Sequence, residues 1–398
     1  MSIFDLSARR FGRAILLSLS VASPAYAQEA PSEPPTPKSL EVEAASGADR
    51  FGDYSDASAG ALGLNLRWNG YLRFAGELVE NDELAQTVGR TDGFKLANAR
   101  IGLAAELGAL FAYVSLEAAA GEADGINDPN QQMRVRLRDA YMRVQMSRLA
   151  RITAGRFKSP YDLGNLKATV RRTFIDLPLE SRGVLATQGY EQAGLSQGRQ
   201  LGLMLHSEKV GLSDDGFDLG YALALTNGNT GDRLFNDSDS PAVFARLSLL
   251  WAEWVQLNFA GFLDRRTTGD LPDLFEEEAM GAEGSLVVAI ESFYFEAQVL
   301  LQTTSFPTAG QPDVFAYGGH AQVSYAIGPF ELGYRFSMLE PNTDDLRSDD
   351  LVMEHGASVV FRFEDLPLSL FLNGTLVEEQ SGRQLSNNRL AALAQLTF

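Results

Sequence analysis

The chain ends on a strand-like pattern that runs to its final residue. Counting back from Phe398, every second residue of the last ten, RLAALAQLTF, is apolar. Chain ends usually fray into water, so a soluble domain gains little from an apolar face there. In hydrocarbon the opposite holds, because an open sheet edge would leave backbone N–H and C=O groups without partners. The pattern therefore predicts a closed sheet in lipid, sealed by its last strand.

Alternation of the same kind begins near residue 62, where Leu66, Trp68 and Phe74 interleave with Arg67 and Asn69. A period of two is typical of a strand with one apolar and one polar face. The segment recurs, and we predict sixteen strands at 62–78, 93–107, 109–120, 133–147, 150–157, 199–207, 216–226, 242–251, 253–265, 279–289, 292–303, 315–327, 329–339, 350–363, 366–377 and 388–398.

The connections between these strands alternate between short turns and long polar loops. That asymmetry is expected of outer-membrane barrels, and an even strand number places both chain ends on the periplasmic side. A soluble sandwich or solenoid is the alternative, but an export signal, a terminal Phe and the absence of cysteine argue against it. The predicted fold is all-β, a 16-stranded antiparallel transmembrane β-barrel with an inward-folded third loop.

Composition divides the chain into three parts. Residues 1–27 have the features of a cleaved signal peptide: three arginines, a short apolar core at 14–21, and Ala-Tyr-Ala at 25–27. Segment 28–61 is rich in Pro, Glu, Ser and Ala without apolar periodicity, which predicts a flexible periplasmic lead. The porin-like barrel domain then spans 62–398. This organisation predicts the outer membrane of a Gram-negative bacterium, with the bilayer and lipopolysaccharide as surroundings.

The charges are unevenly spread. The formal net charge is −19, which argues against nucleic acid as a partner. Residues 134–199 nevertheless hold thirteen basic and five acidic side chains. This stretch contains the longest connection, about 158–198, and a loop of that size is usually functional. The lumen of a 16-stranded barrel is an aqueous channel, so an infolded basic loop would narrow it and favour anions.

Arginine and lysine side chains in and beside this loop are the candidate pore and anion-binding groups, because guanidinium forks match phosphate or carboxylate oxygens. Some of them could instead pair with acids on the barrel wall. In the fourth strand, Arg136 and Arg138 lie on the opposite parity from Arg143, which a bulge near Asp139 would reconcile. The candidates are Arg143, Arg156, Lys158, Lys167, Arg171, Arg172, Arg182 and Arg199.

Four stretches resemble the phosphate-selective porin O and P family: LRDAYMRV at 137–144, ITAGRFKSPYDLGNL at 152–166, TFIDLPLESRGV at 173–184 and GRQLGLMLHS at 198–207. The resemblance implies a trimeric sixteen-stranded channel for small inorganic anions, phosphate among them, whose third loop folds inward. It implies constriction roles for the basic residues that match these motifs and their flanks, which are Arg143, Arg156, Lys158, Arg171, Arg172, Arg182 and Arg199. The outer loops are more acidic than this pattern leads one to expect, as at 276–278.

Other channel functions remain open at this stage. A general or sugar-type porin would use lumen aromatics, for which Tyr161, Phe174 and Tyr190 are candidates. A structural or adhesin barrel would have a plugged lumen and pass no current.

An outer-membrane enzyme would need a histidine beside a nucleophile. The three histidines, His206, His320 and His355, lie in different predicted strands without a recognisable nucleophile motif. We therefore predict a channel and no enzyme, with no catalytic residues, metal ligands or cofactor.

Overall fold

The structure is a computed structural model that describes residues 55–59, 63–80, 92–118, 135–184, 188, 192–211, 216–228, 236, 238, 240–252, 254–268, 274–307, 310–343, 351–379, 385 and 387–398. The predicted signal peptide, most of the predicted lead, Arg134 and Tyr190 lie outside these residues.

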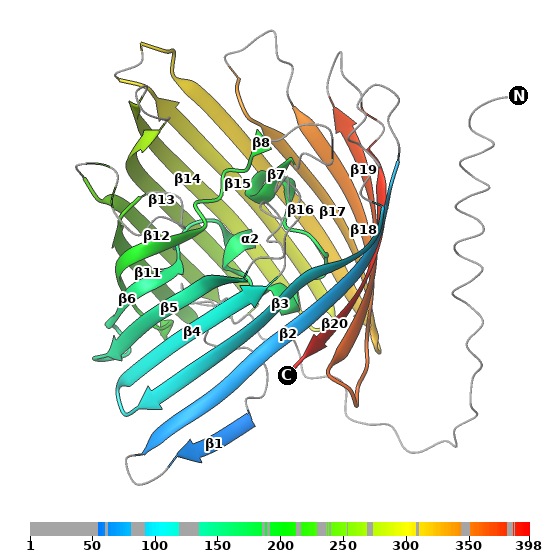
Figure 1. Cartoon of the computed structure of the whole chain (residues 1–398), viewed down its shortest axis with the longest axis horizontal. Coiled ribbons are helices and arrows are strands. Elements are labelled where there is room, and N and C mark those ends of the chain that lie inside the picture. The colour runs from blue at the N-terminus through cyan, green and yellow to red at the C-terminus, as the bar shows by residue number, and fades with distance from the viewer. Residues whose placement is uncertain are drawn as a thin grey trace, which may run out of the picture. The chain divides into compact units, whose positions relative to one another are not determined.

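Sixteen antiparallel strands, each paired with its neighbours in chain order, close into a barrel (Figure 1). They are β2 (Leu64–Val79), β3 (Gly93–Leu107), β4 (Leu110–Ala118), β5 (Val135–Gln145), β6 (Arg151–Lys158), β9 (Arg199–His206), β11 (Phe217–Thr226), β12 (Ala242–Trp251), β13 (Val255–Thr268), β14 (Phe275–Ile290), β15 (Phe293–Ser305), β16 (Val314–Ile327), β17 (Phe330–Glu340), β18 (Val352–Arg362), β19 (Leu368–Glu379) and β20 (Arg389–Thr397).

Besides β1 (Ser55–Ala59), six short elements complete the described structure. The third loop contains α2 (Leu163–Leu166), a 3-10 turn η1 (Thr169–Arg171), α3 (Leu179–Arg182), β7 (Gly183–Val184) and β8 (Gln192–Ala193), and β10 (Val210–Gly211) pairs with β11. All sixteen predicted strands are present, so the predicted fold class is confirmed. The sequence predicted no strand before residue 62, yet β1 (Ser55–Ala59) pairs with the first half of β2. Residues 55–59 of the segment predicted to be a flexible lead therefore belong to the sheet.

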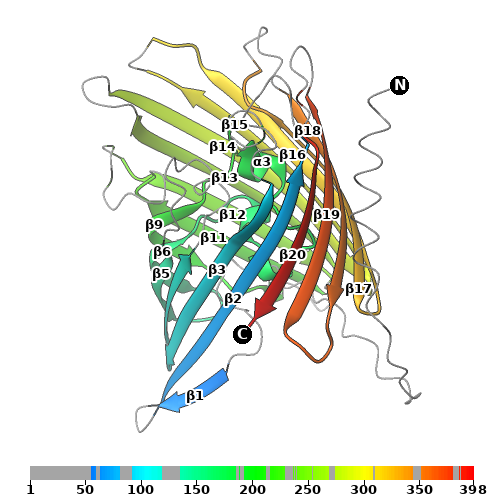
Figure 2. The ribbon, with the colours of Figure 1, turned by 45° about the vertical axis from the view of Figure 1, so that its right-hand side comes forward.

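The two ends of the barrel chain meet in one seam. β20 pairs antiparallel with both β19 and β2 (Figure 2). Beyond the last strand residue, Gly70 N–H donates to the Phe398 carbonyl at 2.7 Å, and Phe398 N–H donates to the Gly70 carbonyl at 3.0 Å. The final residue thus supplies a pair of closing hydrogen bonds, which is why the alternating pattern continues to the end of the chain.

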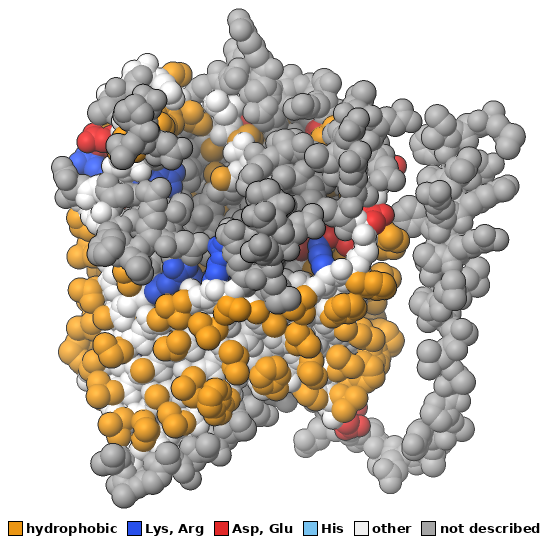
Figure 3. Space-filling model, in the orientation of Figure 1, with side chains coloured by type: hydrophobic (Ala, Val, Ile, Leu, Met, Phe, Trp, Pro, Cys, Tyr) orange, Lys and Arg blue, Asp and Glu red, His pale blue; other side chains and the backbone are white. Residues whose placement is uncertain are grey.

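Burial in the strands is the reverse of that in a soluble protein. In β2, Trp68 is 48% exposed and Phe74 is 49% exposed, whereas Arg73 is 2% exposed. The apolar face points outward and the polar face points into the barrel. Figure 3 shows the result as a belt of hydrophobic side chains around the strands, with Lys and Arg side chains directly above it. An outward apolar band over a polar interior is the arrangement of a transmembrane barrel.

Tight turns gather at one end of the barrel. Gly108, Ala252, Glu291 and Gly328 join successive strand pairs, and each has a positive φ between 50° and 59°. Glycine adopts this left-handed conformation without steric cost, and the two other residues accept a modest strain. The long connections leave the opposite end, as the sequence predicted.

Among the residues that the structure describes, no helix is long and apolar enough to cross a membrane.

Replacing Gly70 should weaken the seam. A Cβ at this position would lie 2.5 Å from the Phe398 ring and 2.7 Å from the Arg100 carbonyl oxygen. We expect Gly70→Val to lower the free energy of unfolding by about 1–3 kcal/mol, because overpacking at a strand pair forces backbone shifts. Urea unfolding in lipid vesicles measures it. Gly374→Val is the control, since no atom lies within 4 Å of a Cβ there, and equal loss in both variants would contradict the expectation.

Candidate functional site

The third loop leaves the wall at β6, crosses the interior and returns to β9. Figure 1 shows α2 and β7 enclosed by the ring of strands. The loop contacts strands on the far side of the barrel, where α3 packs against β16 and β17. The inward fold predicted for this loop is therefore confirmed. Its contacts decide which of the predicted cations remain accessible.

The first part of the loop is anchored by apolar side chains. The buried Tyr161 ring meets Phe262 edge to face at 4.9 Å between centroids, and its hydroxyl donates to the Ala282 carbonyl at 3.2 Å. Leu163 packs with Leu250 of β12 and Val287 of β14 in a buried cluster. Residues far apart in sequence thus fix the path of the loop along the wall.

Asp162 adds polar contacts at the same point. It accepts a hydrogen bond from Ser181 Oγ at 3.0 Å and from Gln298 Nε2 at 2.9 Å. The same Gln298 accepts from Gly164 N–H at 3.1 Å through its amide oxygen. The loop is therefore tied to β15 and to its own later segment together.

Glycines in the wall make room for the second part of the loop. A Cβ at Gly333 would lie 2.8 Å from Thr173 and 3.4 Å from the Phe174 ring, and one at Gly318 would lie 2.5 Å from Glu180. Phe174 is held from its other side by the Arg335 guanidinium, 4.4 Å from the ring centroid. Loop and wall approach more closely here than side chains on the strands would allow.

These contacts bear on the sugar-track alternative. Tyr161 and Phe174, which the sequence offered as exposed lumen aromatics, are 0% and 3% exposed. Both rings pack between the loop and the wall, so neither presents a face to a solute. That role is corrected for these two residues.

Arginines of the wall donate hydrogen bonds to backbone carbonyls of the loop. Arg73 of β2 donates to the Ile175 carbonyl at 2.9 Å. Arg335 of β17 donates to the Asp176 carbonyl at 3.0 Å and to that of Leu177 at 3.3 Å. The carbonyl oxygens of an irregular segment need donors when they are buried, and the wall supplies them.

The Asp176 side chain is held by Arg389 of β20 at 2.8 Å. Burial alone would raise the pKa of Asp176, but the charges of Arg389 and Arg182 hold it below its usual range. The carboxylate therefore stays ionised, and its attraction to β20 persists across the neutral and mildly acidic range.

Arg182 of α3 forms a buried ion pair with Glu354 of β18. The two side chains are 1% and 2% exposed. The Nη1 atom of Arg182 also donates to the Gly183 carbonyl at 2.7 Å and to the side-chain oxygen of Gln188 at 3.0 Å. The structure places Arg182, predicted as a pore cation, in an ion pair that joins the loop to the wall.

His320 of β16 lies between two glutamates, one from the loop and one from the wall. Its Nδ1 faces Glu180 of α3, and its Nε2 lies 2.9 Å from Glu296 of β15. These three side chains form one buried cluster. Lys167 completes it by pairing with Glu296 and contacting Tyr294. The structure thus places Lys167 in an ion pair with the wall, and its pore role stays a prediction.

A second charged cluster lines the wall where the loop begins and ends. Arg100 of β3 pairs with Glu117 of β4 at 2.8 Å, and Arg138 pairs with the same glutamate. Arg199 of β9 pairs with Asp139 of β5 at 2.8 Å. Three arginines thus share two carboxylates, and the cluster keeps an excess of positive charge. Arg199 was expected as a free pore cation, whereas here its charge is shared with Asp139.

Lys158 lies beside this cluster and caps the end of α2. Its ammonium donates to the carbonyls of Leu166 at 3.0 Å and Lys167 at 3.2 Å. Cations are favoured at a helix C-terminus, where carbonyls lack partners. The residue is 6% exposed, and its pore-lining role stays a prediction.

The bulge predicted near Asp139 is present. In the pairing of β4 with β5, Ser115 faces Asp139 while Leu116 faces Leu137, so Arg138 is the extra residue. The shift brings Arg138, Asp139 and Arg143 to the inner face. Arg143 is buried with its guanidinium 4.4 Å from the centroid of Phe111.

Arg156 does not face the lumen. It pairs with Ala140 on one side and Leu201 on the other, on the face where Met142 and Leu203 are exposed. Its Nε donates to the Arg138 carbonyl at 3.0 Å. Paired residues share a face, and the pore role of Arg156 stays a prediction.

Arg171 and Arg172 occupy a different environment from the other six candidates. They sit at the end of η1, where Arg171 is exposed and Arg172 is half-buried, in the middle of the infolded segment. Arg171 is the one exposed residue among the eight.

Sequence reasoning missed the wall residues that hold the loop: Arg73, Arg335, Arg389, His320, Glu296 and Glu354. The only signal available was their inward parity within a strand. Alternation shows that a side chain enters the lumen, but it does not show which loop residue it meets. No cluster of His, Asp or Glu suited to a metal ion occurs among the described residues.

Removing one partner of the Arg182–Glu354 pair should loosen the loop. We expect Glu354→Ala to cost about 3–5 kcal/mol locally, because Arg182 would keep a buried charge without its carboxylate. Single-channel recordings should then show added current fluctuations. Arg148→Ala is the control, because the Arg148 side chain is 78% exposed in its ion pair with Glu208. An exposed pair of this kind contributes about 1 kcal/mol at most. A quiet Glu354→Ala channel would show that this pair does not hold the loop.

Comparisons with known proteins agree with this architecture. Residues 70–233 match the model of the family described as phosphate-selective porin O and P, which confirms the resemblance over this part of the chain. No curated protein matches the chain.

Several solved structures share the fold. The outer membrane channel DcaP of Acinetobacter baumannii has 14% identity and a TM-score of 0.60, covering 86% of this chain and 99% of that chain. An anion-selective porin from Comamonas acidovorans has 12% identity and a TM-score of 0.58, covering 84% and 100%. OmpT of Vibrio cholerae, in trimer form, has 10% identity and a TM-score of 0.56, covering 84% and 99%. At these identities the likeness concerns the fold. Together with the family match it indicates a channel of the Gram-negative outer membrane rather than an enzyme.

Proposed function

We propose that this outer-membrane channel, whose residues 70–233 carry the phosphate-selective porin O and P pattern, passes small inorganic anions by diffusion through a water-filled pore. The observation that carries the proposal is the position of Arg171 and Arg172. They lie in the middle of the infolded loop, where Arg171 is exposed and Arg172 is half-buried.

The wall cluster supports the same preference. Arg100, Arg138 and Arg199 outnumber Glu117 and Asp139, and Lys158 lies beside them. Arg138 is 28% exposed at its side chain, so this excess charge is partly open to water. Low-dielectric walls focus such a field into the channel. Anions passing the loop would meet positive charge on both the loop and the wall.

The preference of the channel for anions over cations should be moderate. Glu296 and Glu354 of the wall pair with loop cations, and Glu283 and Glu331 pair with wall arginines, so these acids attract passing cations only weakly. Phosphate is a candidate solute because arginine forks bind its oxygens in pairs. An anion-selective porin stands among the structures with this fold, which is consistent with the proposal.

Three further features belong to the proposal. Residues 1–27 act as a cleaved signal peptide, the segment 28–61 as a periplasmic lead and 62–398 as the channel domain. Loop 158–198 sets the constriction. The chain assembles as a homotrimer, as the trimer form of the Vibrio cholerae OmpT structure suggests for this fold.

Reversing the charges of Arg171 and Arg172 tests the proposal. We expect Arg171→Glu with Arg172→Glu to shift the reversal potential of a planar bilayer under a salt gradient toward cation preference, because the sign of the charge at the constriction changes. Arg148→Glu, at the turn between β5 and β6, should leave the reversal potential unchanged. If the double variant keeps the wild-type value, these arginines do not control selectivity.

A general porin without anion preference is the competing function. Liposome swelling separates the two, since it measures the entry of solutes of matched size. We expect small anions to enter faster than neutral sugars of similar size, and high salt to reduce the difference because screening shortens the range of the arginine field. Equal rates for charged and neutral solutes would favour the general porin.

A further inference from the structure

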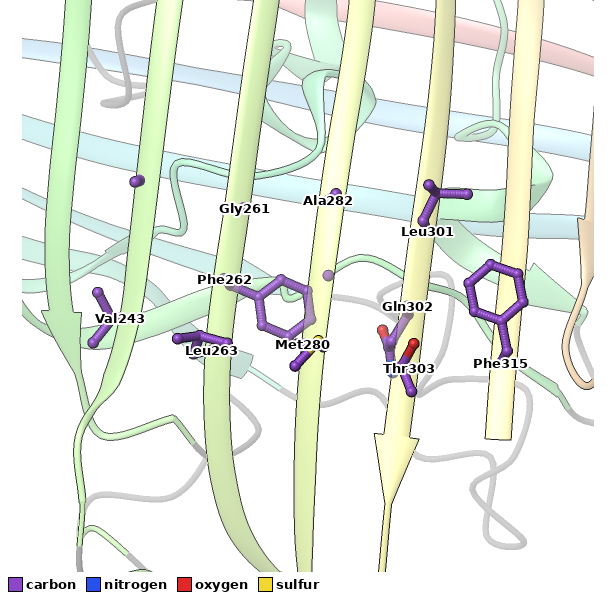
Figure 4. A pocket seen from close by; sticks show the side chains of 12 residues that line it. Val243, Gly261, Phe262, Leu263, Met280, Ala282, Leu301, Gln302, Thr303 and Phe315 are labelled. Carbon is purple, nitrogen blue, oxygen red and sulfur yellow. The ribbon is translucent and has the colours of Figure 1, made fainter. Parts of the chain in front are cut away.

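The outer wall of the barrel has a groove over β12 to β16 (Figure 4). Its volume is about 510 Å³, within the range of roughly 300–1,000 Å³ typical of small-molecule sites. Its floor is a row of small residues paired across three strands: Ala245, Gly261 and Ala282. Because the outward face of this wall lies in hydrocarbon, the groove is open to lipid and not to the lumen.

Large apolar side chains rim the groove on the side of the long loops. Val243, Leu263, Met280 and Phe315 stand in one register row, each between 37% and 58% exposed. Barrel strands tilt by about 35–45° from the membrane normal, so a groove that crosses the strands is also inclined toward the normal. A hydrocarbon chain in a leaflet can therefore lie along it.

Charge begins immediately above the rim. The next outward pair along β13 and β14 is Arg265 with Glu278, at 2.8 Å between Nε and Oε1. These side chains are 63% and 41% exposed, so the pair is weak. The Arg265 guanidinium has five N–H donors, and one carboxylate leaves most of them available for phosphate oxygens.

We propose that this groove and Arg265 form a binding site for one outer-leaflet lipid with a phosphorylated headgroup, the lipid A part of lipopolysaccharide. One acyl chain packs on the floor of small residues, and a headgroup phosphate pairs with Arg265. Lipid tails are as apolar as leucine, so the chain is held by close packing and not by exclusion of water. The phosphate contact fixes the lipid's depth.

Native mass spectrometry of the full-length protein in detergent tests the site with purified lipid A. The variant Ala245→Leu with Ala282→Leu fills the floor, and we expect it to need about tenfold more lipid A for half occupancy of the first site. Such a change corresponds to about 1.4 kcal/mol. Ala357→Leu is the matched control, because Ala357 is exposed on the outer face of β18, away from the groove, and should bind as wild type does.

A second arm separates the two halves of the site. Arg265→Gln should weaken the binding of lipid A severalfold and leave the binding of dephosphorylated lipid A unchanged. Cold and heated gel migration verifies that each variant is a folded barrel.

Three results would overturn the proposal. Wild-type affinity in the filled-floor variant would show that the groove is not the site. Equal affinity for phosphatidylglycerol, lost in the same variants, would make a phospholipid the occupant. A changed number of chains per assembly with lipid binding intact would show that the groove receives a second copy of the chain.

Discussion

Closure of the sheet is the constraint on which the rest of the structure depends. In hydrocarbon there is no water to hydrogen-bond an unpaired backbone group, so the first and last strands of the barrel must pair with each other. The seam of β2 and β20, finished by the hydrogen bonds of Gly70 and Phe398, satisfies this requirement. Once the cylinder is closed, one face of every strand belongs to lipid and the other to the lumen, and the side chains sort by alternation.

The lumen then becomes a place where charges must be balanced. The third loop brings cations inward, and the wall receives them with carboxylates: Arg182 meets Glu354, and Lys167 meets Glu296. Arginines of the wall in turn donate hydrogen bonds to loop carbonyls and pair with Asp176. Among the eight candidate cations, Arg171 in the middle of the loop is the exposed one.

Much of the fold could be predicted from the sequence, because alternation, turn spacing and the terminal Phe are local signals of a single requirement. The bulge at Arg138 was also foreseeable, since two stretches of one strand disagreed in parity. The candidate site was less predictable. Counting basic residues identified the right segment, but it did not distinguish Arg171 from Arg182, which differ in partner and not in type.

By itself the sequence determined the number of strands, which faces meet lipid, and the segment that turns inward. These follow from periodicities that neighbouring residues express together. Only the tertiary structure decided which loop cation meets which wall acid, which glycines make room for Phe174 and Glu180, and where His320 lies. Those pairings join residues more than a hundred positions apart, and no local pattern records a contact that exists only when the cylinder closes around the loop.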